Sequence, residues 1–225
     1  MGLPWMGRAE CRYMYVNKIY SFDMNNSIKQ LKKIDPDLIK LFDHFMVDDL
    51  SPEENYFKAL TRSIIYQQLS GKAAKTILDR FIHIYPDYSY PTPEAVINTD
   101  IDILCSAGLS NNKAHYIKNI ARAFLDDPDT YDNLDRMKDQ DIIELLTAVK
   151  GIGPWTAQMF MMFTLNRPDV FPATDLAIQK GYQKYFKLDD LPKPNQMLKR
   201  SELWSPHRTT VSLFLWEVVD GAFEW

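Results

Sequence analysis

The chain has 225 residues, of which 46% are hydrophobic and 25% are charged, a composition typical of a globular protein with a buried core. Its formal net charge of −4 argues against a uniformly basic nucleic-acid binder, but the dense acidic run in residues 125–144 leaves a local basic face open. No apolar run reaches the roughly 18 residues of a membrane span, and residues 1–20 lack the apolar centre of a signal peptide. The two cysteines, Cys11 and Cys105, are too few for a disulfide or metal framework. We therefore expect a cytoplasmic protein.

Apolar residues recur at intervals of three and four along nearly the whole chain, which is the period of an α-helix. Ser70 and Ser110 precede two of the periodic segments as N-caps, and Gly108 ends another. Only residues 1–20 leave room for a strand, and no internal repeat occurs. We predict an all-α protein of about ten helices, over residues 27–45, 56–70, 71–85, 92–99, 100–109, 110–125, 138–149, 153–163, 174–186 and 205–219.

A short connection, residues 150–153, joins two of these helices and contains a pair of glycines. Gly151 can take the positive φ that ends the first helix, and Pro154 suits the first position of the second, where no N–H is needed. We expect Ile152 to pack between the helices. Such a helix–hairpin–helix points N–H groups toward an anion such as a DNA phosphate, and Lys150 adds a charge. An ordinary αα-hairpin is the alternative, because the spacing alone is weak evidence.

Several ordered stretches carry a family resemblance. They read “SIIYQQLSGKAA”, “AGLSNNKAHYIKNIA”, “VKGIGPWTA”, “FPATDLAIQKGY” and “WSPHRTTVSLFLW”, and they fall within residues 55–220. Together they resemble the helix–hairpin–helix DNA glycosylases with a Gly/Pro-rich loop and a downstream aspartate (HhH-GPD). More narrowly, they are similar to the 3-methyladenine DNA glycosylase II, or alkylpurine, branch.

The resemblance implies an HhH-GPD glycosylase fold. In that fold a central bundle of about six helices faces a second helical layer from the N- and C-terminal segments, with the active-site cleft between them. We expect the bundle at residues 56–165, including the helix–hairpin–helix at 145–160. Residues 26–55 and 166–225 would form the second layer. Residues 1–25 match nothing in the family, and their order is left open.

Asp175 stands where the family has its catalytic aspartate. Thr174 is a good N-cap, so we expect Asp175 in the first turn of a helix. There a carboxylate can stabilise the oxocarbenium-like transition state of glycosidic cleavage and orient or deprotonate the attacking water. The simpler interpretation is that this acid only complements the helix dipole.

Trp155 occupies the position at which the lyase-competent relatives have a lysine nucleophile. An indole forms no Schiff base, so the resemblance implies a monofunctional glycosylase without strand cleavage. We expect Trp155, Trp216 and Met159 to line the base pocket, where an aromatic face attracts a cationic alkylpurine. Core packing is the alternative for both tryptophans. The family often has an aromatic residue at Met159, so the pocket differs in shape here.

The resemblance also implies contacts with DNA. Gln67 or Gln68 would fill the gap that the flipped nucleotide leaves or read the minor groove. The alternative for both is an ordinary exposed helix C-terminus. Arg208 would have a structural role, pairing with Asp175 or bracing the loop before it. His207 replaces an aromatic ring of the relatives, with an effect that is left open. Candidate phosphate contacts are Lys150, Gly151, Gly153, Ser70, Lys72, Asn112 and Lys113.

No cofactor is expected for catalysis. The resemblance implies a monovalent cation, Na⁺ or K⁺, on the hairpin carbonyls of Thr147, Val149 and Ile152. The iron–sulfur cysteines of the endonuclease III relatives are absent from the sequence, which has two cysteines. The expected partner is double-stranded DNA with damaged bases, bound by a monomer that associates with the nucleoid, or lies in the nucleus of a eukaryote, and not with a membrane.

The implied activity is a base excision repair glycosylase. It would flip an alkylated purine such as 3-methyladenine or 7-methylguanine out of duplex DNA and hydrolyse its N-glycosidic bond, leaving an abasic site. The alternatives are the same fold acting on uracil, hypoxanthine or ethenoadenine, and a non-catalytic module that binds lesions. A helical interaction protein without a role on DNA is a further alternative, which the acidic charge favours.

Overall fold

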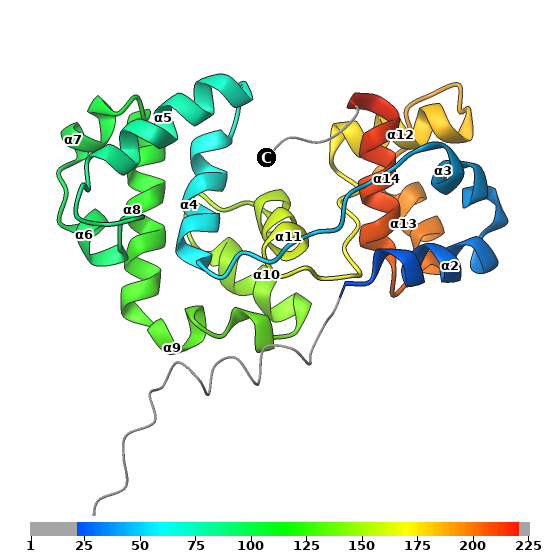
Figure 1. The fold of residues 1–225 in the computed structure, drawn as a ribbon, viewed down its shortest axis with the longest axis horizontal. Coiled ribbons are helices and arrows are strands. Elements are labelled where there is room, and N and C mark those ends of the chain that lie inside the picture. The colour runs from blue at the N-terminus through cyan, green and yellow to red at the C-terminus, as the bar shows by residue number, and fades with distance from the viewer. Residues whose placement is uncertain (1–21, 221–225) are drawn as a thin grey trace, which may run out of the picture.

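The computed structural model describes residues 22–220, and in that part of the chain every regular element is a helix (Figure 1). The predicted all-α class is therefore confirmed. The α-helices are α2 (Met24–Ile34), α3 (Ile39–His44), α4 (Tyr56–Tyr66), α5 (Gly71–His83), α6 (Pro93–Ile97), α7 (Ile101–Ser106), α8 (Asn111–Asp126), α9 (Pro128–Tyr131), α10 (Asp139–Ala148), α11 (Pro154–Phe163), α12 (Leu176–Phe186), α13 (Pro194–Ser201) and α14 (Arg208–Asp220). Three short 3₁₀ turns complete them: η2 (Pro36–Leu38), η3 (Leu134–Arg136) and η4 (Glu202–Trp204).

The predicted helix over residues 27–45 is wrong in one respect, because the chain breaks at Asp35 and Pro36 into α2, η2 and α3. Proline has no N–H for the helix ladder, and the Asp35 side chain caps the following 3₁₀ turn instead. Two short helices that begin with proline, α9 and α13, were not predicted. The strand left open for residues 1–20 lies outside the described residues.

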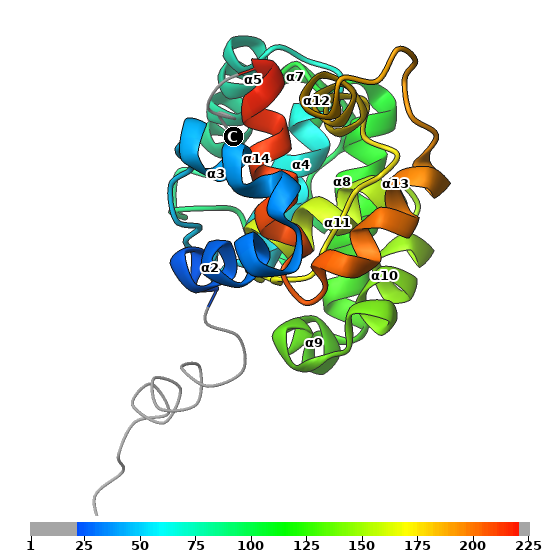
Figure 2. The same cartoon turned by 90° about the vertical axis from the view of Figure 1, so that its right-hand side faces the viewer.

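The helices fall into two groups with α10 and α11 between them (Figure 1), and Figure 2 views the molecule along the line that joins the groups. One group contains α4 to α9, in which α8 packs against both α4 and α6. The other contains α2, α3 and α12 to α14, in which α12 packs closely on α14. A Cβ atom at Gly181 of α12 would lie only 2.0 Å from the carbonyl oxygen of Leu215. Only glycine therefore permits this approach of the two helices.

A buried carboxylate ties the N-terminal helices to the C-terminal ones. Asp35 accepts a hydrogen bond of 2.9 Å from the indole of Trp204 and forms an ion pair of 3.1 Å with Arg200. Trp204 and Asp35 are both buried. Because a buried charge needs such partners, this cluster fixes α2 and α3 against α13 and η4.

A buried guanidinium fixes the segment between α11 and α12. Nη2 of Arg167 donates to the carbonyls of Asp135 at 2.9 Å and Met137 at 2.8 Å, just before α10. Its Nε lies 3.4 Å from a carboxylate oxygen of Asp139. The segment that leads to Asp175 is thereby held to the start of the helix–hairpin–helix.

Candidate active site

The helix–hairpin–helix forms as predicted. Gly151 has a φ of 117°, and a Cβ atom there would lie 2.4 Å from Cγ of Tyr116, so both the backbone and the packing require glycine. Ile152 is buried between the helices, and Pro154 opens α11. No atom lies within 4 Å of a Cβ built on Gly153. The start of α11 therefore presents an open backbone surface.

Asp175 is itself the N-cap of α12, so the prediction of Thr174 as the cap, with Asp175 inside the first turn, is wrong. Its Oδ1 accepts the backbone N–H of Ile178 at 2.9 Å. Aspartate is at least as good an N-cap as threonine, and as the cap its carboxylate faces the unpaired N–H groups at the start of the helix. The side chain is half-buried at the positive end of the dipole of α12.

Two tryptophans donate to this carboxylate. Nε1 of Trp155, at the start of α11, lies 2.7 Å from Oδ2 of Asp175, and Nε1 of Trp216 in α14 lies 3.2 Å from Oδ1. Trp216 is buried, and its ring stacks on Phe163 with 5.8 Å between centroids. The structure thus brings Asp175, Trp155 and Trp216 together from three helices. The sequence singled out these residues but did not indicate the hydrogen bonds between them.

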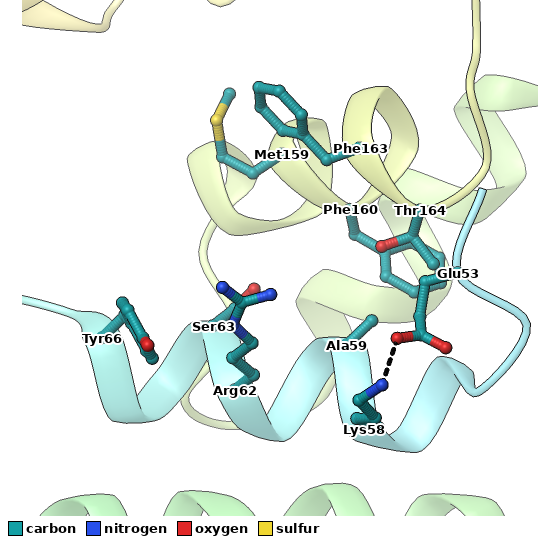
Figure 3. A pocket seen from close by; sticks show the side chains of 10 residues that line it. All are labelled: Glu53, Lys58, Ala59, Arg62, Ser63, Tyr66, Met159, Phe160, Phe163 and Thr164. Atoms are coloured by element: carbon teal, nitrogen blue, oxygen red, sulfur yellow. Dashed lines mark hydrogen bonds and ion pairs between the residues drawn. The ribbon is translucent and has the colours of Figure 1, made fainter. Parts of the chain in front are cut away.

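A groove of about 80 Å³ lies between α4 and α11 (Figure 3), and one of its lining residues, Phe163, is the residue that stacks on Trp216. Met159 and Phe163 form its α11 wall, and Arg62 lies 5.1 Å from the centroid of the Tyr66 ring on α4. Met159 is 2% exposed, so its predicted place in the base pocket is limited to the wall. Phe163, Arg62 and Tyr66 were not predicted at this site. The four-residue spacing from Met159 to Phe163, and from Arg62 to Tyr66, could have indicated these pairs.

The end of α4 separates the two glutamines. Nε2 of Gln67 donates to Oγ1 of Thr156 in α11 at 3.2 Å, so Gln67 faces the protein. Gln68 is exposed and has a φ of 58°, in the left-handed region that few L residues adopt. Leu69 follows and is also exposed. Of the two wedge candidates, Gln68 is the one that faces outward.

The candidate phosphate contacts differ in their surroundings. Lys72 and Lys150 are exposed, and Ser70 caps α5 with its hydroxyl 3.4 Å from the N–H of Ala73. Lys113 is half-buried, and burial lowers the pKa of its ammonium. Asn112 is exposed beside it. The phosphate contact of Lys113 stays a prediction, but its ammonium already donates to two backbone carbonyls of α4 and its C-cap.

Arg208 pairs with Asp169 and not with Asp175. Its guanidinium donates to both carboxylate oxygens of Asp169, at 2.7 and 2.8 Å, and so braces the loop that precedes Asp175. Burial alone would raise the pKa of the Asp169 carboxyl. The hydrogen bonds from Arg208 and Ser205 outweigh this effect and hold that pKa below its usual range. His207 lies nearby against Ser27 of α2, with 3.1 Å between Nδ1 and Oγ.

The residues of the expected cation site form hydrogen bonds within the hairpin and α10. The Val149 carbonyl accepts the N–H of Ile152 at 3.0 Å, and the hydroxyl of Thr147 donates to the carbonyl of Ile143. Within residues 22–220, no cluster of three or more His, Cys, Asp or Glu side chains could hold a metal ion. No helix among these residues is long and apolar enough to cross a membrane.

Comparisons with known proteins identify the family. The family model described as “HhH-GPD superfamily base excision DNA repair protein” matches residues 61–206. The chain is 36% identical to DNA-3-methyladenine glycosylase 1 of Schizosaccharomyces pombe, over 80% of this chain and 79% of that protein. It is 31% identical to a putative DNA-3-methyladenine glycosylase of Bacillus subtilis, over 88% of this chain and 76% of that protein.

A solved structure also matches. It is the 3-methyladenine DNA glycosylase of Schizosaccharomyces pombe in complex with abasic DNA, with a TM-score of 0.72 and 34% sequence identity. The match covers 86% of this chain and 95% of that one. The chain therefore belongs to the HhH-GPD superfamily of base excision DNA repair proteins.

Proposed function

We propose that this chain is a monofunctional DNA glycosylase that removes alkylated purines, such as 3-methyladenine and 7-methylguanine, from double-stranded DNA and leaves an abasic site. The observation that carries the proposal is the carboxylate of Asp175, which the N-terminus of α12 and the indoles of Trp155 and Trp216 hold in place. The relatives named as 3-methyladenine DNA glycosylases support the lesion class.

Asp175 would act mainly through its charge. Its oxygens accept from three N–H donors, so the carboxylate has a fixed position and few free lone pairs. As the C1′–N bond of a flipped cationic nucleotide breaks, the electron pair leaves with the base and positive charge develops on the sugar. A preorganised carboxylate stabilises that charge. Water then adds to C1′ and releases a proton to solvent.

The tryptophan at position 155 determines the type of reaction. Trp155 has no amine that could attack C1′, so hydrolysis would end at the abasic site without strand cleavage. The rings of Trp155 and Trp216, with Met159 in the wall, would receive the base. A cationic purine over an aromatic face gains about 0.5–2 kcal/mol.

The DNA would lie across the hairpin and the turn after α4. Phosphates would approach the N–H groups at Gly151 and Gly153, with Lys150, Ser70 and Lys72 around them, and Gln68 would fill the gap that the flipped nucleotide leaves. We expect a monovalent cation on the carbonyls of Thr147, Val149 and Ile152. The active species would be a monomer that acts where the cell keeps its DNA.

A second candidate lesion class follows from the groove wall. Met159 is flexible and has no ring, and Arg62 adds a cation to the same groove, which favours a neutral lesion such as hypoxanthine or ethenoadenine over a cationic one. The same assay separates the two candidates when the substrate is varied.

The test is base release from duplex DNA treated with a methylating agent, beside duplexes that contain uracil, hypoxanthine or ethenoadenine. We expect release of 3-methyladenine or 7-methylguanine, and strand breaks only after alkali treatment. Release of a neutral lesion alone would favour the second candidate. Strand breaks without alkali, or no release from any substrate, would contradict the proposal.

A further inference from the structure

The turn after α4 has a backbone conformation that needs support. The helix ends at Tyr66, Gln67 is its C-cap, and Gln68 takes a φ of 58° although it is not a glycine. Gln67, with φ −52° and ψ 129°, and Gln68 are thus the central residues of a type II turn, whose second central position is usually Gly or Asn. A glutamine in this position would relax toward a negative φ unless other contacts hold the turn.

Lys113 supplies such contacts from α8. Its Nζ lies 2.8 Å from the carbonyl oxygen of Ile65 and 2.7 Å from that of Gln67, on either side of the last residue of α4. Carbonyls at a helix C-terminus lack intrahelical partners and form the negative end of the dipole, so a cation suits both. The N–H of Leu69, 3.3 Å from the carbonyl oxygen of Tyr66, closes the turn itself.

The position of Lys113 is itself fixed. Lys113 lies in the first turn of α8, where its own N–H donates to the Ser110 cap, and α8 packs along α4. The ammonium is half-buried, and it forms no ion pair within residues 22–220. The charge of Lys113 is therefore directed at the end of α4.

We propose that Lys113 is a positioning residue that holds the turn at Gln68 in its left-handed conformation, so that the Gln68 side chain is presented for insertion into the duplex. This inference rests on the proposed function, since insertion matters only if the protein flips a nucleotide. Without Lys113 the carbonyls of Ile65 and Gln67 lose their donor. The turn then relaxes, and Gln68 no longer points outward in one fixed direction.

The test compares two substrates that differ only in base pairing. One has a single lesion in a fully paired duplex, and the other has the same lesion and flanks inside an unpaired bubble, where no wedge is needed. We expect Lys113→Met to lower the single-turnover rate of base release from the paired duplex about 10-fold or more and to leave the bubble rate within about 2-fold. Lys113→Arg, which keeps the donors and the charge, should restore most of the paired rate.

Lys118 provides a matched control on the same helix. Its Nζ donates to the carbonyl of Ile97, at the end of α6, at 3.1 Å, so Lys118→Met removes a similar contact from another helix end. We expect Lys118→Met to leave the ratio of the two rates unchanged. Gln68→Ala should lower the paired rate alone, and adding Lys113→Met to it should cause no further loss, because both changes act through one side chain.

Three outcomes of the rate and binding measurements would overturn the inference: equal losses on the two substrates, additive losses with Gln68→Ala, or a lower salt dependence of binding in Lys113→Met, which would indicate a phosphate contact. If Lys113→Met does not fold, Lys113→Gln takes its place.

A further readout needs no base release, namely 2-aminopurine fluorescence opposite a stable abasic analogue. If the wild type releases no base but Lys113→Met and Gln68→Ala both lower this signal, the proposed activity is contradicted and the positioning role stands. An unchanged signal in Lys113→Met overturns the positioning role.

Discussion

At the scale of single residues, the indole hydrogen bonds to Asp175 are the most specific feature of the site. An aspartate at a helix N-terminus is common, but here Trp155 donates to one oxygen at 2.7 Å and Trp216 to the other at 3.2 Å. These contacts fix the plane of the carboxylate relative to any sugar that enters the site. In the proposed mechanism the tryptophans would therefore serve both as aromatic walls and as donors that orient the carboxylate.

Replacing Trp155 with phenylalanine separates these roles, since it keeps an aromatic ring and removes the N–H. A hydrogen bond to a charged group contributes about 1.5–3 kcal/mol, so we expect Trp155→Phe to lower single-turnover base release by roughly 10- to 100-fold. Binding to DNA with an abasic-site analogue should stay within about 3-fold.

Trp204→Phe is the control, because it removes another indole–carboxylate bond, the 2.9 Å contact with Asp35. It should lower the free energy of unfolding without changing the release rate of the folded enzyme. An unchanged release rate in Trp155→Phe would show that the indole N–H has no part in catalysis.

At the scale of elements, the two hairpin glycines should respond differently to alanine. Gly151 has a φ of 117° and no room for a Cβ atom beside Tyr116, so Gly151→Ala should lower the free energy of unfolding by about 2 kcal/mol or more. Gly153 has an ordinary φ of −93° and open space around it. Gly153→Ala should therefore unfold like the wild type in urea and bind abasic DNA more weakly. Equal stability of the two variants would contradict this assignment.

The pair of Asp169 and Arg208 should make stability depend on pH. The folded-state pKa of Asp169 lies below that of the unfolded chain. The pair therefore stabilises the protein above the unfolded pKa of about 3.9. This contribution is lost as the pH falls through the folded pKa.

Replacing the carboxylate shows this dependence. Asp169→Asn should lower the free energy of unfolding at pH 7 by about 1–3 kcal/mol. Its difference from the wild type should shrink below about pH 4. Urea unfolding at several pH values measures both effects, and a difference that does not change with pH would exclude the ion pair as its source.

Much of the fold could be predicted because it depends on local patterns. The helical period, the caps at Ser70 and Ser110 and the glycine–proline hairpin are encoded within a few residues each, and the structure has all of them. The break at Pro36 was missed because the apolar period continues through it. Helices α9 and α13 were missed because they are short and mostly polar.

The partners of long side chains could not be predicted in the same way. Lys113 was expected to contact a phosphate, and Arg208 was expected either to pair with Asp175 or to brace the loop before it. In the structure their partners lie 46 to 48 residues away for Lys113 and 39 residues away for Arg208. Such contacts depend on how the helices pack, which a pattern along the chain does not contain.

At the scale of the whole molecule, part of the acidic run lies away from the turn after α4, which belongs to the proposed DNA face. The acidic run, residues 125–144, includes α9, which lies at the opposite end of the molecule from the turn between α4 and α5 in both views (Figures 1 and 2). A net charge of −4 is therefore compatible with a local basic face.

Salt dependence tests this separation of charge. We expect the affinity for abasic DNA to fall steeply as salt rises, because each neutralised phosphate contributes about −0.9 to the logarithmic slope. Lys72→Met and Lys150→Met should each reduce the slope by about 1. Lys75→Met, which removes an exposed lysine on α5 that lies near Asp79, is the control and should leave the slope unchanged. A flat dependence in the wild type would contradict the proposed face.

The measurement that tests the central claim most directly is single-turnover base release from methylated duplex DNA by Asp175→Asn. Asparagine is also a good N-cap, so α12 should still form. We predict a release rate about 100-fold or more below that of the wild type, with binding to abasic DNA retained. Asp23→Asn makes the same change at the exposed N-cap of α2 and should have the wild-type rate. Undiminished release by Asp175→Asn would show that another group stabilises the transition state.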